Sequence, residues 1–251
     1  MEAKSNVAKQ RVPVNRSSRS LFSEGKRKVN GATSVQDYKT GLALLKQAAA
    51  LGQVEAHEWL GAIYDYGLGT RKSGRLALHH YRIAAEARQP NAEYHVGVFY
   101  YEGVGVSQNY HLAVKWLRRA AKHGDLTAVY VLGRCYRFGQ GVPQNRRKGF
   151  LLLLDAARKG VLDAQYSVGV CLSRGEGVRS EPRKAFKWYL IAAKRGYPDA
   201  AHNVAYFYET GRGVAKNKIK ADFWYGRAKA LTELGRKACT PVLGKPNSMT
   251  A

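Results

Sequence analysis

The sequence predicts an all-α protein, an α/α solenoid in a right-handed superhelix built from helix-turn-helix repeats of 36 residues. Three recurring features carry this prediction. An alanine pair and a turn with two glycines return at this step, as at Ala120/Ala121 and Gly139/Gly141. A single glycine returns at the same step, at Gly61, Gly97, Gly133 and Gly169, with Ala205 next. Because each helical pair buries its apolar face only against its neighbours, such a period is typical of a solenoid.

One complete unit can be followed from Tyr110 to Val142. Apolar residues at three- and four-residue spacing predict one amphipathic helix over residues 110–123 and another over residues 126–138. Gly133, in the middle of the second of these helices, has no side chain, so we expect a neighbouring helix to approach it closely. The Gly-Gln-Gly-Val turn at residues 139–142 supplies the permissive backbone for a reversal of direction.

The two ends of the chain differ in composition from the repeats. The first 35 residues carry eight Lys or Arg against two acids and few apolar residues, which predicts a disordered basic tail over residues 1–34. Residues 35–231 are predicted to form the solenoid, as an N-terminal half-unit that lacks a first helix, followed by five repeats. Two prolines and little periodicity predict a loose tail over residues 232–251.

The sequence shows no segment that predicts secretion or membrane insertion. Its start has no apolar core of the length that a secretory signal needs, and no later run approaches membrane-spanning length. We therefore expect a cytoplasmic protein. An organellar transit peptide in the Arg- and Ser-rich start is an alternative, which Glu2, Pro13 and the lack of a clear amphipathic helix disfavour.

The repeats resemble a known family. The pattern A-x-x-x-L/V-G-x-x-Y-x-x-G-x-G-V, followed by K-A-x-x-W-x-x-x-A-A-x-x-G, is similar to the Sel-one-like repeat, a relative of the tetratricopeptide repeat. The fit is close at Ala92–Val106, Lys184–Gly196 and Ala200–Val214 and extends over about Val35 to Leu231. The sequence departs from the motif at His80, Arg88, Leu152 and Leu172. The resemblance implies an adaptor, scaffold or regulator that holds other proteins; similar bacterial proteins act in signalling regulation, envelope assembly and toxin neutralisation.

Motifs for catalysis, metals and cofactors do not occur in the sequence. The seven histidines form no HExxH, and neither CxxC nor GxxxxGK[ST] is found. His79 and His80 are adjacent and so point about 100° apart on a helix, which predicts a surface pair. Cys135 and Cys171 occupy the same apolar position in successive repeats and are predicted to be buried, as in a reducing compartment, while Cys239 is predicted to be an exposed thiol. We expect no enzyme, no cofactor and no metal.

A partner-binding surface is predicted on the first helix of each repeat. Counted from the opening alanine, residues at positions two, three, six, nine and ten face away from the core and are expected to line a concave groove. Tyr, Trp and Arg are the residue types that most often dominate binding energy. Packing between repeats remains an alternative for Tyr94, Tyr130 and Tyr166, because tyrosine is common at that place in the family. The predicted contacts are Trp59, Tyr66, Tyr94, His95, Tyr101, Tyr130, Arg134, Arg137, Phe138, Tyr166, Arg174, His202, Asn203 and Tyr206.

Charge gives a second indication of function. The chain carries 42 Lys or Arg against 18 acids, a net charge of +24 that favours acidic partners. The excess extends over the second helices, which are expected to form a convex wall. We favour a monomer that holds a protein segment, acidic or of mixed charge, in the concave groove; the alternative is binding of nucleic acid or an anionic surface by the wall and the tail. The wall residues are Arg118, Arg119, Lys122, Arg146, Arg147, Lys148, Arg183, Lys184 and Lys187.

Overall fold

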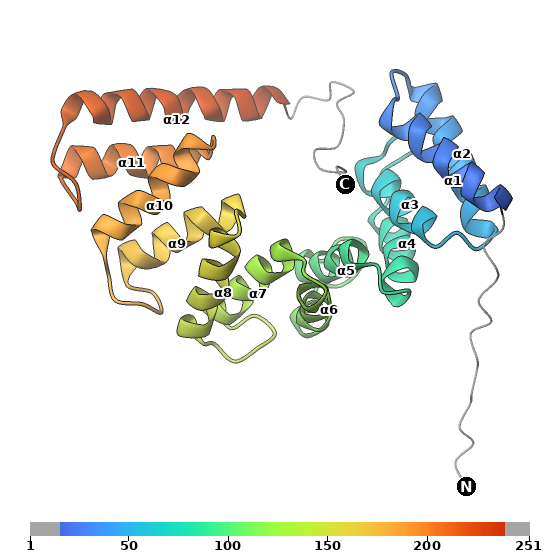
Figure 1. Ribbon diagram of the computed structural model, residues 1–251, viewed down its shortest axis with the longest axis horizontal. Helices are drawn as coiled ribbons and strands as arrows, with labels where there is room; N and C mark the ends of the chain where they lie inside the picture. The colour runs from blue at the N-terminus through green and yellow to red at the C-terminus, as the bar shows by residue number, and fades with distance from the viewer. Residues whose placement is uncertain (1–15, 239–251) are drawn as a thin grey trace, which may run out of the picture. The chain divides into compact units, whose positions relative to one another are not determined.

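The computed structural model describes the backbone of residues 16–238 and the side chains of residues 17–234. This part of the chain folds into twelve α-helices without a strand (Figure 1), which confirms the predicted all-α solenoid. The helices are α1 (Arg16–Asn30), α2 (Val35–Ala50), α3 (Glu55–Tyr66), α4 (Gly74–Glu86), α5 (Pro90–Glu102), α6 (Tyr110–Lys122), α7 (Leu126–Phe138), α8 (Arg146–Arg158), α9 (Leu162–Arg174), α10 (Pro182–Lys194), α11 (Pro198–Thr210) and α12 (Lys218–Ala238).

The described chain divides into two compact units. Residues 16–92 and 104–106 form unit 1, and residues 93–103 and 107–238 form unit 2. Helices α1 to α4 belong to unit 1, and α6 to α12 with most of α5 belong to unit 2. None of the described helices is both long and apolar enough to cross a membrane.

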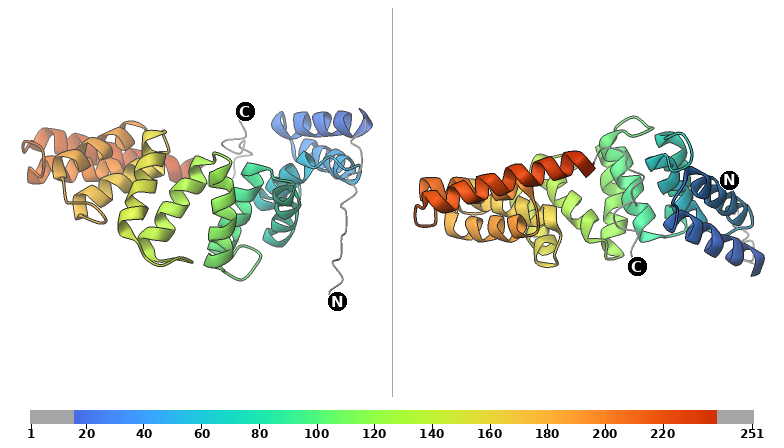
Figure 2. Two further views of the ribbon diagram at one scale, coloured as in Figure 1. Left: turned by 60° about the horizontal axis from the view of Figure 1, so that its bottom comes forward. Right: turned by 90° about the horizontal axis from the view of Figure 1, so that it is seen from above.

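The spacing of the helices reproduces the period of the sequence. The first helices α5, α7, α9 and α11 begin at residues 90, 126, 162 and 198, each 36 residues after the last. The second helices α6, α8, α10 and α12 begin at residues 110, 146, 182 and 218, with the same step. Figures 1 and 2 show these pairs following one another in order along unit 2.

Two kinds of glycine bring the helices together. A Cβ atom on Gly133 in α7 would lie 2.9 Å from Cγ of Leu153 in α8, so the predicted close approach is confirmed. Gly141, in the turn after α7, has a φ of 69°, and a Cβ there would overlap the carbonyl group of Tyr110 at the start of α6. The contact at Gly133 packs the two helices of one repeat together. The contact at Gly141 packs the turn against the preceding repeat.

The two described cysteines lie in the core of unit 2. Cys135 and Cys171 are both buried, as predicted. Burial raises the pKa of Cys135 to about 11 and also raises that of Cys171, so both thiols are protonated at neutral pH. They act as small apolar residues rather than as nucleophiles. Cys239 lies outside the described residues.

The prediction of a disordered N-terminal tail is wrong from Arg16 onwards. Residues 16–30 form α1, which packs against α2 and buries Val29. The close approach depends on Gly25, where a Cβ would lie 2.9 Å from Cγ of Leu45. The presumed half-unit is therefore a complete helical pair. Residues 1–15 of the predicted tail lie outside the described residues.

The predicted C-terminal boundary is also wrong. Helix α12 continues past Leu231 and ends at Ala238, so the loose tail does not begin at residue 232. One side of this helix packs against α11 through Ala221, Trp224 and Ala228, and this packing supports the first half of the helix. Residues 239–251 lie outside the described part of the chain.

Arg88 occupies a backbone position that glycine fills in other repeats. Its φ is 65°, where Gly52, Gly124, Gly160 and Gly196 have φ values between 85° and 97°. A left-handed conformation costs a residue with a Cβ about 1–2 kcal/mol, and glycine loses about 0.5–1 kcal/mol more backbone entropy than alanine on folding. Arg88→Gly is therefore expected to raise the free energy of unfolding by about 1 kcal/mol.

Urea unfolding followed by circular dichroism measures this change. The matched control is Ala87→Gly, because Ala87 has a φ of −81°. This control should lower the free energy of unfolding by about 0.5–1 kcal/mol. A lower stability for Arg88→Gly than for the parent chain would contradict the assigned strain.

Candidate functional site

The outward side of the first helices in unit 2 carries a row of aromatic side chains at one repeated position. Tyr94, Tyr130 and Tyr166 stand 36 residues apart on α5, α7 and α9, and all three are half-buried. The Tyr166 ring stacks on Tyr197 with centroids 4.7 Å apart, so part of each ring serves packing. Residues that share this side in unit 2 are called the first-helix face: Tyr94, Tyr130, Arg134, Phe138, Tyr166, Arg174, His202, Asn203 and Tyr206.

Arg134 joins two repeats within the first-helix face. Its guanidinium carbon lies 5.8 Å from the ring centroid of Tyr101 on α5 and 5.9 Å from that of Tyr130 on its own helix. The side chain is half-buried between these rings. Within residues 17–234 no carboxylate forms an ion pair with it. Arg134 therefore gives the face a positive charge that contacts two aromatic rings.

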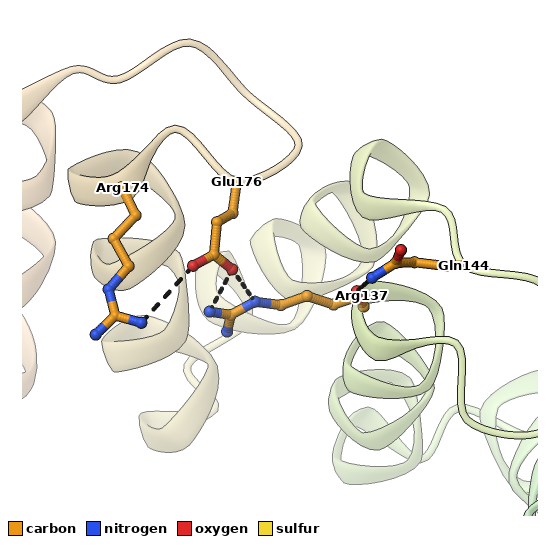
Figure 3. A network of polar contacts seen from close by, with 4 residues as sticks. All are labelled: Arg137, Gln144, Arg174 and Glu176. Carbon is orange, nitrogen blue, oxygen red and sulfur yellow. Dashed lines mark hydrogen bonds and ion pairs between the residues drawn. The ribbon is translucent and has the colours of Figure 1, made fainter.

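Arg137, three residues later, is in a different environment (Figure 3). The Nε and Nη2 atoms of Arg137 lie 2.7 and 2.6 Å from Oε2 of Glu176. Arg137 as a whole is only 8% exposed. Nη1 of Arg174 is 3.7 Å from the other carboxylate oxygen, and the Gln144 amide donates a 2.9 Å hydrogen bond to the Arg137 carbonyl. The prediction that Arg137 lines an open groove is wrong, because this side chain is enclosed between repeats.

The environment of Arg137 recurs along unit 2. The Tyr101 hydroxyl donates a 2.7 Å hydrogen bond to the side chain of Gln140, and Arg212 donates one of 2.6 Å to the Ser173 carbonyl. In each pair the partners are 39 residues apart, as Arg137 and Glu176 are. Position nine of a first helix thus contacts the residue between the two turn glycines of the next repeat. It forms a clamp between repeats rather than a free surface.

Trp59 and His95 have environments that sequence alone did not indicate. Trp59 is 8% exposed, and Nζ of Lys26 on α1 lies 5.5 Å from its ring centroid; the prediction that Trp59 lines an open surface is wrong, because its side chain is buried within unit 1. Tyr66, in the same unit, is 55% exposed. His95 is half-buried with its ring against Tyr94, and burial lowers its pKa to about 4, so it is neutral at pH 7.

Four of the five remaining predicted contacts of unit 2 are open to solvent. Phe138 and Tyr206 are 51% and 43% exposed, large values for aromatic residues on a folded surface. Arg174 and His202 are also exposed, and Asn203 is half-buried beside Tyr166. Exposed acids flank these residues at Asp163, Asp199 and Glu209. The first-helix face therefore combines apolar rings, two arginines and a rim of mixed charge.

Several basic residues of the second helices form contacts within the chain. Arg119 lies 2.8 Å from Oε1 of Glu93, which is completely buried, and it stacks over the ring of Trp116 at 4.4 Å. The Arg118 guanidinium donates a 2.9 Å hydrogen bond to the hydroxyl of Tyr136. These contacts give Arg118 and Arg119 a structural role that their spacing did not predict. Lys184 lies 2.7 Å from the Glu181 carboxylate.

Tyr136 contacts two basic residues of the predicted convex wall. Nζ of Lys148 lies 4.2 Å from its ring centroid, on the side of α8, and Arg118 reaches it from α6. Hydrogen bonds from Lys148 and Arg118 lower the pKa of the Tyr136 hydroxyl. The wall residues exposed without such a described contact are Lys122, Arg146, Arg147, Arg183 and Lys187.

A histidine contact in unit 1 was missed by sequence reasoning. The Nδ1 atoms of His57 and His80 lie 3.0 Å apart, and the His80 ring stacks on Tyr64. Burial lowers the pKa of His80 to about 4, so one neutral ring donates a hydrogen bond to the other at pH 7. The predicted surface pair of His79 and His80 is wrong for His80, because its partner comes from another helix. No cluster of three or more potential metal ligands occurs among the described residues.

The family of the chain follows from the repeats themselves. Six stretches match the Sel1 repeat model, at residues 27–53, 54–88, 90–125, 127–161, 162–197 and 198–232. The chain belongs to the Sel1 repeat family. Sel1 repeats are typically non-catalytic and generally mediate protein–protein interactions. The first match includes the end of α1, in agreement with the complete helical pair at the N-terminus.

Solved structures of similar fold include further Sel1 repeat proteins. One, from Oxalobacter formigenes, is 27% identical with a TM-score of 0.70, over 85% of this chain and 84% of that one. A protective antigen of uropathogenic Escherichia coli is 24% identical with a TM-score of 0.76; the match covers 91% of this chain but half of that one. An immunity protein from Pseudomonas aeruginosa is 20% identical with a TM-score of 0.56, over 88% and 84%. No curated protein matches the chain.

Proposed function

We propose that this Sel1 repeat protein is a non-catalytic adaptor, scaffold or regulator whose first-helix face binds an acidic segment of a protein partner. The observation that carries the proposal is Arg134, a half-buried guanidinium held over Tyr101 and Tyr130 without a carboxylate partner among the described residues. Partly buried charges in proteins are usually paired. Arg137 follows that rule through Glu176, and Arg134 leaves the place open for a carboxylate of the partner.

The surroundings of Arg134 suit a protein ligand. Phe138 lies one helical turn further along α7, and Tyr206 offers a second exposed ring on α11. Aromatic and arginine side chains are the usual anchors of protein interfaces, because they bury large areas and form directed polar contacts. A planar guanidinium that already rests on aromatic rings loses little conformational freedom when it binds a carboxylate.

The basic wall supports the same partner chemistry through its long-range field. Arg146 and Arg147 occupy the first two positions of α8, where the positive end of the helix dipole disfavours cations by about 0.3–1 kcal/mol each. Both side chains are exposed and lack a described ion pair. A net charge of +24 is expected to accelerate the approach of an acidic partner more than it strengthens the final complex.

The test begins with capture of the partner from a nuclease-treated lysate of the source cells. Arg134→Ala combined with Phe138→Ala should then weaken binding severely, because anchors of this kind contribute about 2 kcal/mol or more each, roughly thirtyfold in affinity. The matched control is Arg158→Ala with Leu151→Ala, an exposed arginine and an exposed apolar residue of α8. This control should bind like the parent chain.

A charge reversal separates the proposal from binding of nucleic acid or an anionic surface. Arg146→Glu with Arg147→Glu should mainly slow association with an acidic protein, and the defect should shrink as salt rises. Nucleic-acid binding would give the opposite ranking, with a severe charge reversal, a silent Arg134/Phe138 variant and log affinity falling linearly with log salt. A silent Arg134/Phe138 variant that still melts cooperatively would rule out the proposed face.

A further inference from the structure

In unit 1 a histidine stands where three other second helices have tryptophan. His80 is the seventh residue of α4, and the seventh residues of α6, α10 and α12 are Trp116, Trp188 and Trp224. His57 meets His80 from α3, with the two Nδ1 atoms 3.0 Å apart and the ring centroids 5.2 Å apart. The departure from the repeat motif at His80 is therefore accompanied by a second histidine that faces it.

The contact between the two rings holds a single proton. A short contact between two imidazole nitrogens needs an N–H group on one ring and a lone pair on the other. A first added proton can bind Nε2 of the donor ring and leaves this hydrogen bond intact. A second must bind the accepting Nδ1, so that two N–H groups face each other across 3.0 Å and the rings have to separate.

The charged and titratable groups that face the pair are basic. Nζ of Lys46 on α2 lies 5.8 Å from the ring centroid of Tyr64, and that ring stacks on His80. The ring of His79, the neighbour of His80 on α4, meets it edge-on with centroids 5.1 Å apart. Lys46 and His79 therefore both oppose a positive charge on His80.

The carboxylates of α3 have other partners. Glu55 accepts a 2.6 Å hydrogen bond from the Gln53 side chain, and Glu58 accepts one of 2.6 Å from Asn91 on α5. Asp65 forms an ion pair of 3.9 Å with a lysine in the turn before α4. Among the described residues, no carboxylate is one of the charged groups that act on the two rings. A protonated pair thus has no anion to compensate it.

We propose that the His57–His80 pair is an acid-sensitive lock between α3 and α4, which holds unit 1 closed at neutral pH and opens it in mild acid. At pH 7 the neutral rings share one proton, and their hydrogen bond joins the two helices. In acid the pair gains charge beside Lys46 and His79, and the rings separate. The tryptophans of α6, α10 and α12 gain no proton in this range, so the lock is particular to unit 1.

The pH range follows from the pKa shifts of the two rings. Burial, together with His57, His79 and Lys46, lowers the pKa of His80 from its ordinary 6.5 to about 4, and burial lowers that of His57 as well. Below pH 6.5 the unfolded pair binds protons that the folded pair does not. The stabilisation is therefore complete above pH 6.5 and is lost as the pH falls toward 4.

Hydrogen exchange of the full chain, followed by mass spectrometry, measures the opening of α3 and α4, with α9 and α10 as a reference within the same chain. After correction for intrinsic exchange rates, protection of α3 and α4 should fall about thirtyfold more than that of the reference between pH 7 and about pH 4.5. Removal of the pair by His57→Ala with His80→Trp should abolish this difference and keep the protection at pH 7. The double variant installs the residues of the last repeat, Ala201 and Trp224.

The matched control is His79→Gln, which removes an exposed histidine of α4 that lies outside the 3.0 Å contact. This control should keep most of the acid response. If the double variant does not fold, His57→Gln takes its place, because it also leaves one ring without its partner. An equal acid response in the parent chain and in the variant without the pair would overturn the proposal. A parent chain whose α3 and α4 keep pace with α9 and α10 into acid would overturn it as well.

Discussion

Glu176→Gln is expected to lower the free energy of unfolding by about 3 kcal/mol. Glu176 supplies both short contacts of the Arg137 guanidinium, which is enclosed between two repeats and cannot lose its proton. Removing one partner of a buried ion pair costs about 3–5 kcal/mol, because the other charge stays buried without compensation. The lower end of that range applies, since the Glu176 side chain is 22% exposed.

Urea denaturation measures this loss, and two further variants show its origin. Arg174→Ala should change the stability by less than about 1 kcal/mol, because its side chain is 69% exposed and its contact with Glu176 is 3.7 Å long. Arg137→Met combined with Glu176→Gln should recover most of the loss, since no buried charge remains. A double variant as unstable as Glu176→Gln alone would mean that the charge of Arg137 is not the cause.

Most of the fold could be predicted from the sequence, because the residues that the packing requires recur with the 36-residue period. Gly133 has no side chain where Leu153 approaches, and Gly141 has a positive φ where the turn meets Tyr110. Both requirements return once per repeat, so the pattern is visible without a structure. Helix α1 was missed for the converse reason. It contains few apolar residues and packs through small contacts such as that of Gly25 with Leu45, which composition does not report.

The candidate site was less predictable because burial there depends on the neighbouring repeat. A helical wheel correctly directs position nine away from the core of its own repeat. The turn of the next repeat then covers that position, which buries Arg137 and engages Tyr101. Trp59 is buried with Lys26 of α1 beside its ring, a contact that a disordered tail over residues 1–34 cannot supply. Arg134, at position six of α7, is not enclosed in this way: it stays half-buried beside the rings of Tyr101 and Tyr130.

Deletion of one whole repeat is expected to leave a folded, shorter protein. Removing residues 133–168 joins Leu132 to Gly169 in the middle of equivalent helices, so that the first half of α7 continues as the second half of α9. In the shortened chain Glu176 takes the position of Gln140, whose side chain accepts a hydrogen bond from Tyr101. The Tyr101 hydroxyl can donate to a carboxylate as well as to an amide oxygen. Each remaining repeat finds an equivalent neighbour, because stability in a solenoid is a sum over repeats and their interfaces.

Where the junction lies should matter, because one repeat contains a buried carboxylate. Glu93 is paired with Arg119 and His123 of its own repeat. Removing residues 97–132, another full period, would take Arg119 and His123 away and place the equivalent residues Asp155 and Lys159 opposite Glu93. This deletion should therefore melt at a lower temperature than deletion of residues 133–168, although both remove 36 residues.

Removing half a repeat should abolish folding of the region around it. Deletion of residues 133–150 would fuse the first half of α7 to the second half of α8, so one helix would have to serve as a first and a second helix together. Every interface after the junction would then lack its equivalent partner. Circular dichroism and thermal melting of the three deletions measure the difference. The 36-residue deletions should keep helical content per residue and a cooperative transition, whereas equal loss in all three would contradict a solenoid built from interchangeable repeats.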